Sequence, residues 1–272
     1  MDSRFVPSVL LTALMASLAL ATASPAQANE RRFTYTYESA VLNPGDREIE
    51  PWSTFRMGRA DFYNRLDNRL EFEMGVVKGL QTALYFNWSS VTKDVNGARE
   101  HESAFTGVSS EWKLKLSDPV ANAFGSALYL EITGGPEEAE VEGKLILDKR
   151  TPNFLFAFNA TGEHGWEFEN KGQTVREGIV ELNAGAAWLA TSHLSAGIEA
   201  RNFNLLTPDD GWSFSALFAG PSVGYATKTW WTTLTVLPQL YKLKGGAADR
   251  GRRLVLSDLD RVEARLLFGF HL

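Results

Sequence analysis

The sequence contains no cysteine. It therefore has neither disulfides nor the lipid-bearing cysteine of a lipoprotein. Beyond residue 28 it also has no uninterrupted apolar run of the about twenty residues that a transmembrane helix needs. Basic residues are not in excess, because 27 Lys and Arg face 33 Asp and Glu, so we expect no nucleic-acid partner.

The first 28 residues have the three parts of a secretory signal peptide. Arg4 is a weak positive start, residues 9–21 form an apolar core, and Ala26-Gln27-Ala28 matches a cleavage site. The apolar core is too short for a comfortable membrane span. We predict a signal peptide over residues 1–28 that is cleaved after Ala28; an uncleaved anchor helix is the alternative.

Residues 69–90 alternate between large apolar and polar side chains. One run covers residues 69–77 and a second covers residues 80–90, with Lys78-Gly79 between them. Period-two alternation is typical of strands, and a break of two residues containing glycine is typical of a hairpin. This stretch therefore predicts a β-hairpin with one apolar and one polar face.

The same pattern recurs to the end of the chain, with short turns alternating with more charged connections. The longer connections are expected at residues 91–103, 134–139, 162–176, 205–212 and 242–260. Short turns on one side and long loops on the other are typical of outer-membrane barrels, whose strands cross the bilayer without helices. We predict an all-β fold over residues 29–272: a closed, antiparallel, up-and-down transmembrane β-barrel of about 12 strands.

The position of the first strand stays open. Residues 32–39 (RFTYTYES) give an even count of twelve strands, and residues 47–58 (REIEPWSTFRMG) are an alternative first strand. The last strand is expected at residues 262–272, where it closes the barrel against the first strand. This ending resembles the C-terminal assembly signal of Gram-negative outer-membrane proteins, which implies the barrel assembly machinery as a partner.

A secreted β-sandwich shows the same alternation, so the aromatic residues must separate the two folds. Near the predicted short turns lie Trp188, Tyr225, Trp230 and Trp231; near the predicted long loops lie Trp88, Trp212 and Tyr241. Two aromatic belts mark the two interfaces of a membrane barrel. Their distribution favours the barrel.

Residues 70–86 (LEFEMGVVKGLQTALYF) and 109–133 (SSEWKLKLSDPVANAFGSALYLEIT) carry a family resemblance. They resemble poorly characterised outer-membrane barrels, including those associated with the meta-cleavage pathway of phenol degradation. The resemblance implies a location in the outer membrane of a Gram-negative bacterium and a transport role. It identifies no substrate.

The polar face of the predicted strands carries the functional hypothesis. Its charged residues are Glu71, Glu73, Glu111, Lys113, Lys115, Glu131, Glu142, Lys144, Glu181, Glu199, Arg201, Glu263 and Arg265. In a barrel these residues line the lumen, where they fill it by mutual pairing or line a narrow aqueous path. We expect a passive channel for small solutes in which Glu71, Glu73, Glu131 and Glu199 govern ion traffic; a structural barrel with a filled lumen is the alternative.

Catalysis is not expected from the sequence. Ser222 in GPSVG (residues 220–224) matches the nucleophile elbow of hydrolases, but no helical pattern follows it. A hydrolase built from a serine and one of His101, His164, His193 or His271 is the least favoured alternative. No metal-ligand spacing or cofactor motif is present. The basic loop at residues 242–253 is predicted to contact outer-membrane lipid, through lipopolysaccharide phosphates.

Overall fold

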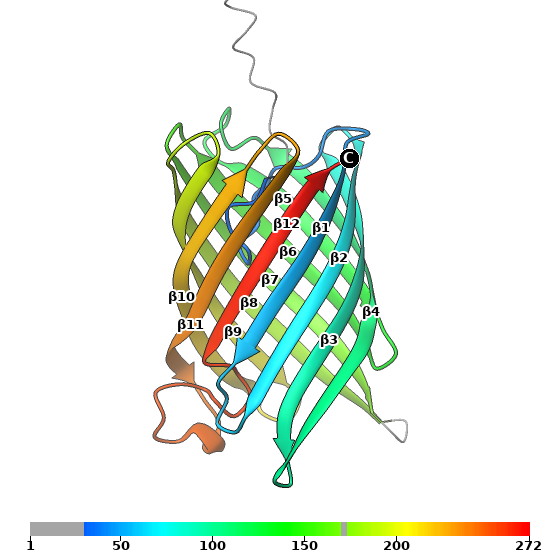
Figure 1. Cartoon of the computed structure of the whole chain (residues 1–272), viewed down its shortest axis with the longest axis vertical. Helices are drawn as coiled ribbons and strands as arrows, with labels where there is room; N and C mark the ends of the chain where they lie inside the picture. The colour runs from blue at the N-terminus through cyan, green and yellow to red at the C-terminus, as the bar shows by residue number, and fades with distance from the viewer. Residues whose placement is uncertain (1–29, 170–172) are drawn as a thin grey trace, which may run out of the picture.

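A computed structural model describes residues 30–169 and 173–272, so the predicted signal peptide lies outside the described residues. Its twelve antiparallel strands follow one another around a closed barrel (Figure 1). The strands are β1 (Arg47–Met57), β2 (Tyr63–Val77), β3 (Leu80–Val95), β4 (Ala98–Ser117), β5 (Gly125–Gly134), β6 (Glu138–Arg150), β7 (Phe154–Glu169), β8 (Gln173–Leu189), β9 (Leu194–Thr207), β10 (Gly211–Ala226), β11 (Trp230–Lys244) and β12 (Val262–His271). The predicted fold class and strand number are confirmed.

Alternating side chains give the wall an apolar outer face and a polar inner face. In β2, Phe72 and Met74 are exposed on the outside, whereas Glu71 and Glu73 between them are buried. Successive residues of a strand point to opposite faces, so one sequence pattern sets both surfaces. A single one-turn helix, η1 (Ala247–Asp249), lies between β11 and β12. In the described part of the chain, no helix is long and apolar enough to span a membrane.

The first strand is β1, the alternative that began at residue 47. Residues 32–39 are not a strand, and the prediction that placed the first strand there is wrong. Their threonines and tyrosines alternate as in a strand, but Phe33, Thr34 and Thr36 are all fully buried, so no face of this segment meets the outside. A wall strand needs one outward face, which residues 47–57 supply with Phe55 and Met57.

At one end of the barrel, strands continue through a segment that was predicted to be a long loop. We call the end where β1 begins and β12 ends the terminal end, and the opposite end the loop end (top and bottom of Figure 1). Residues 91–103 were predicted to be a loop, but β3 and β4 continue through them to a turn at Asn96 and Gly97. Both turn residues have positive φ, which is the geometry of a two-residue hairpin turn. Only residues 245–261 form a long connection among the described loops.

The last strand closes the barrel as predicted. β12 pairs with β1 from Val262 opposite Met57 to His271 opposite Glu48. The amide of Leu272 also donates a hydrogen bond of 3.0 Å to the carbonyl of Arg47. Closure leaves no unpaired sheet edge.

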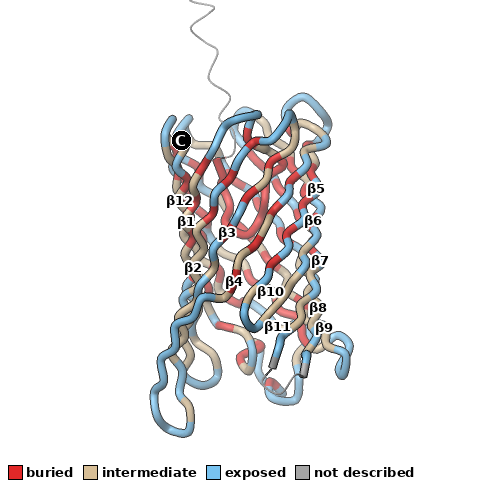
Figure 2. The backbone as a smooth tube through the Cα atoms, turned by 90° about the vertical axis from the view of Figure 1, so that its right-hand side faces the viewer, coloured by how far each residue is buried: buried red, intermediate tan, exposed pale blue. Residues whose placement is uncertain are grey.

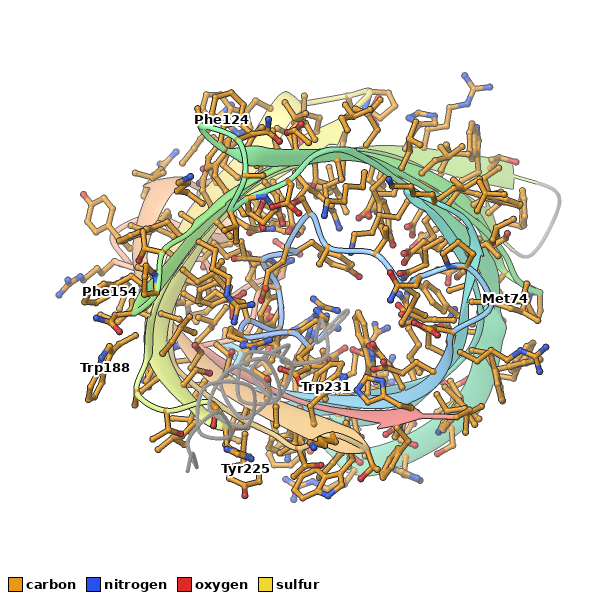
Figure 3. The ribbon with its side chains drawn as sticks, turned by 90° about the horizontal axis from the view of Figure 1, so that it is seen from above. Met74, Phe124, Phe154, Trp188, Tyr225 and Trp231 are labelled. Carbon is orange, nitrogen blue, oxygen red and sulfur yellow. The ribbon has the colours of Figure 1, made fainter. Side chains whose placement is uncertain are left out.

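The aromatic belts hold except at one position. Trp188 and Tyr225 point outward near the terminal end, and Trp88, Trp212 and Tyr241 are exposed toward the loop end (Figure 3). Trp231 points into the lumen instead, is 1% exposed, and donates a hydrogen bond from Nε1 to Glu48. Because Trp230 and Trp231 are neighbours on one strand, they face opposite sides. The prediction that both belong to the belt is therefore wrong.

Candidate functional site

Residues 30–46 enter the lumen from the terminal end and occupy it. We call this segment the plug; it contains no helix or strand. Seen along the barrel, it forms a loop inside the ring of strands (Figure 3). Eleven of its residues are nearly or fully buried: Glu30, Arg31, Arg32, Phe33, Thr34, Tyr35, Thr36, Tyr37, Glu38, Ser39 and Leu42.

Glu199 of β9 is the main anchor of the plug. Its carboxylate accepts hydrogen bonds from the backbone N–H groups of Thr34 (3.1 Å), Tyr35 (2.7 Å) and Thr36 (2.5 Å). Glu199 is fully buried. Hydrogen bonds to an ionised acceptor are stronger than neutral ones, and buried backbone donors need partners. Glu199 therefore acts on the plug, which the sequence pattern alone did not indicate.

Other wall side chains bind the rest of the plug backbone. Asn159 accepts from the N–H of Tyr37 at 2.6 Å and donates to its carbonyl at 3.0 Å, as a neighbouring strand would. Asp148 accepts from the N–H and hydroxyl of Ser39, at 3.2 and 2.6 Å. Gln81 accepts from the N–H of Leu42 at 2.9 Å. Side chains of the wall thus replace the sheet hydrogen bonds that the plug lacks.

The plug separates two cavities. A cavity of about 740 Å³ opens at the terminal end and is lined by Arg31 and Arg32 of the plug and by the short turns. A second cavity of about 420 Å³, which we call the vestibule, lies toward the loop end. Its plug-side boundary includes Tyr35 and Tyr37. The buried residues of the barrel lie mainly in its terminal-end half (Figure 2).

Acidic residues follow one another across the wall from β4 to β7. Glu111, Glu131, Glu142 and Glu163 lie directly opposite one another in successive strand pairs. Like charges in such positions destabilise a sheet unless they are compensated. Arg69 lies 3.1 Å from Glu131, and Lys144 lies 3.0 Å from Glu142.

A second acidic group lies on β1 and β2. Carboxylate oxygens of Glu50, Glu71 and Glu73 all lie within 4.8 Å of one another, and all three residues are buried. Glu50 stands directly opposite Glu71 in the strand pair. Oxygens at this spacing have the chemistry to hold a hard cation. The sequence did not indicate the group because its members come from two strands whose register only the fold sets.

The thirteen charged residues predicted to line the lumen all lie on the inner side of the wall. The control of ion traffic by Glu71, Glu73, Glu131 and Glu199 stays a prediction. The thirteen residues separate into different environments. Glu181 and Glu263 flank Arg201, whose guanidinium binds both. Arg265 donates from Nε to Thr54 at 2.8 Å and from Nη1 to the carbonyl of Thr34 at 3.3 Å. Lumen residues of β1 were missed because residues 47–58 were only an alternative strand.

The connection from β11 to β12 narrows the loop end. Val255 is fully buried in an apolar cluster that also contains Tyr35 of the plug. Gln239 holds Val255 by accepting from its N–H at 2.6 Å and donating to its carbonyl at 3.0 Å. Burial raises the pKa of Asp249, but hydrogen bonds from Ser257 and from the Leu256 amide outweigh it, so this pKa lies below its ordinary value. The basic loop predicted to meet lipopolysaccharide is part of this folded connection.

Ser222 lies within β10, where no strand-to-helix junction exists. It is 2% exposed, and its hydroxyl donates a hydrogen bond of 3.2 Å to the carbonyl of Arg32 in the plug. Ser222 is therefore a plug contact in this structure.

Both ring nitrogens of His101 lie within hydrogen-bond distance of a hydroxyl group. Nδ1 lies 2.9 Å from Oγ1 of Thr92, and Nε2 lies 3.3 Å from Oγ of Ser103. Cross-strand pairing places Thr92 opposite His101 and Trp88 opposite Phe105 on one face of β3 and β4. Trp88 and Phe105 are exposed on the outside of the wall, so the array faces outward beyond them. A register shift between Asn87 and Trp88 sets this face, which the sequence pattern did not indicate.

The barrel is similar to several solved structures. The COG4313 outer-membrane channel from Pseudomonas putida F1 aligns over 90% of this chain and 100% of its own, with 9% identity and a TM-score of 0.65. The NanC porin aligns over 82% and 100%, with 10% identity and a TM-score of 0.55. The β domain of the Bordetella autotransporter BrkA aligns over 85% and 100%, with 9% identity and a TM-score of 0.51. At these identities the likeness shows the fold.

No curated protein matches the sequence. One family model matches residues 25–150 and 157–272, which is most of the chain, and that family is described as one of unknown function. The closed barrel with its internal plug is thus the structure of a member of this group: the chain belongs to the family of unknown function DUF6662.

Proposed function

We propose that this protein is an outer-membrane channel for small solutes, constricted by its own N-terminal segment. One observation carries the proposal: two polar cavities approach each other from opposite ends of a closed barrel, and the plug lies between them. A barrel that is only structural has no need of a 420 Å³ charged vestibule. The outer-membrane barrels and channels among the similar structures support the location and the role.

The constriction limits solute size. Tyr35 and Tyr37 project from the plug at the vestibule, and Val255 reaches the same cluster as Tyr35 from the opposite side. The wall side chains that bind the plug here are polar, such as Asn159, Asp148 and Gln81, which favours small hydrated solutes. A link to phenol degradation stays a prediction, as do contacts of the basic loop with lipopolysaccharide.

Swelling of liposomes tests the proposal. Vesicles that contain the refolded protein are placed in isosmotic solutions of an uncharged pentose and of a trisaccharide. We expect the pentose to enter faster than the trisaccharide. If neither solute enters while the protein migrates as a folded, heat-modifiable barrel, the filled structural barrel replaces the channel.

The array of Ser103, His101 and Thr92 favours a second candidate, ester hydrolysis at the membrane surface. With hydrogen on Nδ1, His101 donates to Thr92 and accepts from the Ser103 hydroxyl through Nε2. The serine oxygen attacks the ester carbonyl as its proton passes to Nε2. The histidine returns that proton to the leaving alcohol, and water then releases the acid from the serine.

An esterase assay separates this candidate from an inert surface. We expect Ser103→Ala to abolish hydrolysis of a fluorogenic phospholipid, whereas Ser222→Ala leaves hydrolysis unchanged. A folded wild-type protein without esterase activity would remove the second candidate and leave the channel intact.

A further inference from the structure

Charges around the vestibule are separated by sign. Its arginines come from β9, β12, β1 and β2: Arg201, Arg265, Arg56, Arg65 and Arg69. Its glutamates come from β5 to β8: Glu131, Glu138, Glu140, Glu142, Glu163 and Glu181. Asp67 and Lys144 are the exceptions, and each is paired with a charge of its own strand, Arg65 at 2.6 Å and Glu142 at 3.0 Å.

The closed strand order sets these two groups against each other. In a ring of twelve strands, β12 stands opposite β6 and β1 stands opposite β7. Between the groups on one side, β3 and β4 contribute only the neutral Asn87, Trp88 and Thr106 to the vestibule. On the other side, β8 and β9 are neighbours, and Glu181 pairs with Arg201. With seven acidic and six basic lining residues, the cavity is nearly neutral as a whole, yet it has a basic and an acidic wall.

Some of the charged residues in the vestibule form ion pairs, and others do not. Arg201 pairs with Glu181 and Glu263, and Arg69 pairs with Glu131. Among the residues that the structure describes, no carboxylate lies within ion-pair distance of Arg265, and no lysine or arginine lies within that distance of Glu140 or Glu163.

The two unpaired sites have donors and acceptors suited to one kind of solute. Arg265 binds a hydroxyl and a carbonyl, so its charge is left without a negative partner. A carboxylate is the natural partner of a guanidinium. Glu140 and Glu163, on β6 and β7, are acceptors for an ammonium group. A solute with one charge gains from one wall only, whereas a zwitterion gains from both.

We propose that the vestibule binds small zwitterions, with the carboxylate toward Arg265 and the ammonium group toward Glu140 and Glu163. The cavity of about 420 Å³ is large enough for a short amino acid. This inference names the solute class of the proposed channel and rests on it for the route of entry.

Calorimetric titration of the detergent-solubilised, full-length mature protein tests the inference without requiring conduction. γ-Aminobutyrate is the probe, and butyrate and butylamine are the singly charged controls. We expect γ-aminobutyrate to bind more tightly than either control. Equal affinity for γ-aminobutyrate and butylamine, or no binding to the folded protein, would overturn the inference.

Two variants neutralise, one wall at a time, the charges proposed to contact the solute. We expect Arg265→Gln to lower the affinity for γ-aminobutyrate by about tenfold, because it removes a charged hydrogen-bond donor. The double variant Glu140→Gln/Glu163→Gln removes the two carboxylates proposed to accept the ammonium group without touching the plug, and it is expected to have a similar effect. Lys115→Gln, in the other cavity, is the matched control and should bind like the wild type.

The outcomes of the two experiments are separable. Binding without solute entry into liposomes would reject the channel and keep the zwitterion site. Solute entry without zwitterion binding would keep the channel and reject this inference.

Discussion

The two halves of the lumen use the same strand pattern for different purposes. Near the terminal end, wall side chains such as Glu199, Asn159 and Asp148 bind the plug backbone and are nearly or fully buried. Toward the loop end, Glu140, Glu163 and Arg265 line an open vestibule and are only partly buried. Alternation alone does not distinguish them; what differs is the presence of a second chain segment to bind.

The comparison shows why a polar inner face is not evidence of a pore. A carboxylate such as Glu199 has the same sequence context as one that faces water, because both alternate with outward apolar residues. Its buried position follows from three backbone N–H groups that need an acceptor. Substitutions matched between the two halves test this distinction.

The largest effect is expected from removing the charge of the plug anchor. Glu199→Gln keeps the volume but weakens three hydrogen bonds, so we expect the plug to lose about 1.5–3 kcal/mol of local stability. Hydrogen exchange at Thr34, Tyr35 and Thr36 should accelerate accordingly. Glu163→Gln makes the same change in the vestibule and should leave this exchange unaltered; equal acceleration in both variants would count against the anchor.

A steric change in the wall should also disturb the plug. A Cβ at Gly185 would lie 2.7 Å from ring carbons of the fully buried Phe33, whereas a Cβ at Gly165 meets nothing within 4 Å. We expect Gly185→Ala to lower the free energy of unfolding by about 1–3 kcal/mol, as overpacking does. Gly165→Ala should have little effect. Urea unfolding followed by tryptophan fluorescence measures both, and equal midpoints would contradict the contact.

Ion selectivity should respond to the vestibule acids more than to the anchor. We expect Glu140→Gln/Glu163→Gln to shift the reversal potential toward anions, because carboxylates concentrate cations near the path. The shift should shrink at 1 M salt, where the Debye length is about 3 Å. Glu100→Gln, in the exposed β3–β4 hairpin, is the control. An unchanged reversal potential in the double variant would remove these acids from the path.

The smallest effect is expected at Ser222. Ser222→Ala removes one hydrogen bond to the plug, that to the carbonyl of Arg32, and should lower the free energy of unfolding by about 0.5–1.5 kcal/mol. The same urea titration measures it. A loss as large as that of Gly185→Ala would mean that Ser222 supports more of the plug than this contact.

The wall was predictable from sequence because its residues repeat with period two. The hairpin at Lys78-Gly79 and the closing strand at residues 262–272 follow directly from that repeat. The plug was not predictable in this way, since Thr34, Tyr35, Thr36 and Tyr37 alternate like a strand. Their burial depends on acceptors such as Glu199, more than a hundred residues away along the chain.

The separated charges of the vestibule also depend on the closed ring. Arg265 and Glu140 are far apart in sequence, and only the order of twelve strands sets β12 against β6. The sequence placed Arg265 on an inner face but had no means to show which acidic residues stand across from it.

Single-channel conductance tests most directly whether the plug sets the constriction. The mature wild type is compared in planar bilayers with a variant that lacks residues 30–42 and retains all twelve wall strands. We predict a several-fold larger conductance for the variant, because its two cavities become continuous. Equal conductance of the two proteins, with both folded and heat-modifiable, would contradict the account.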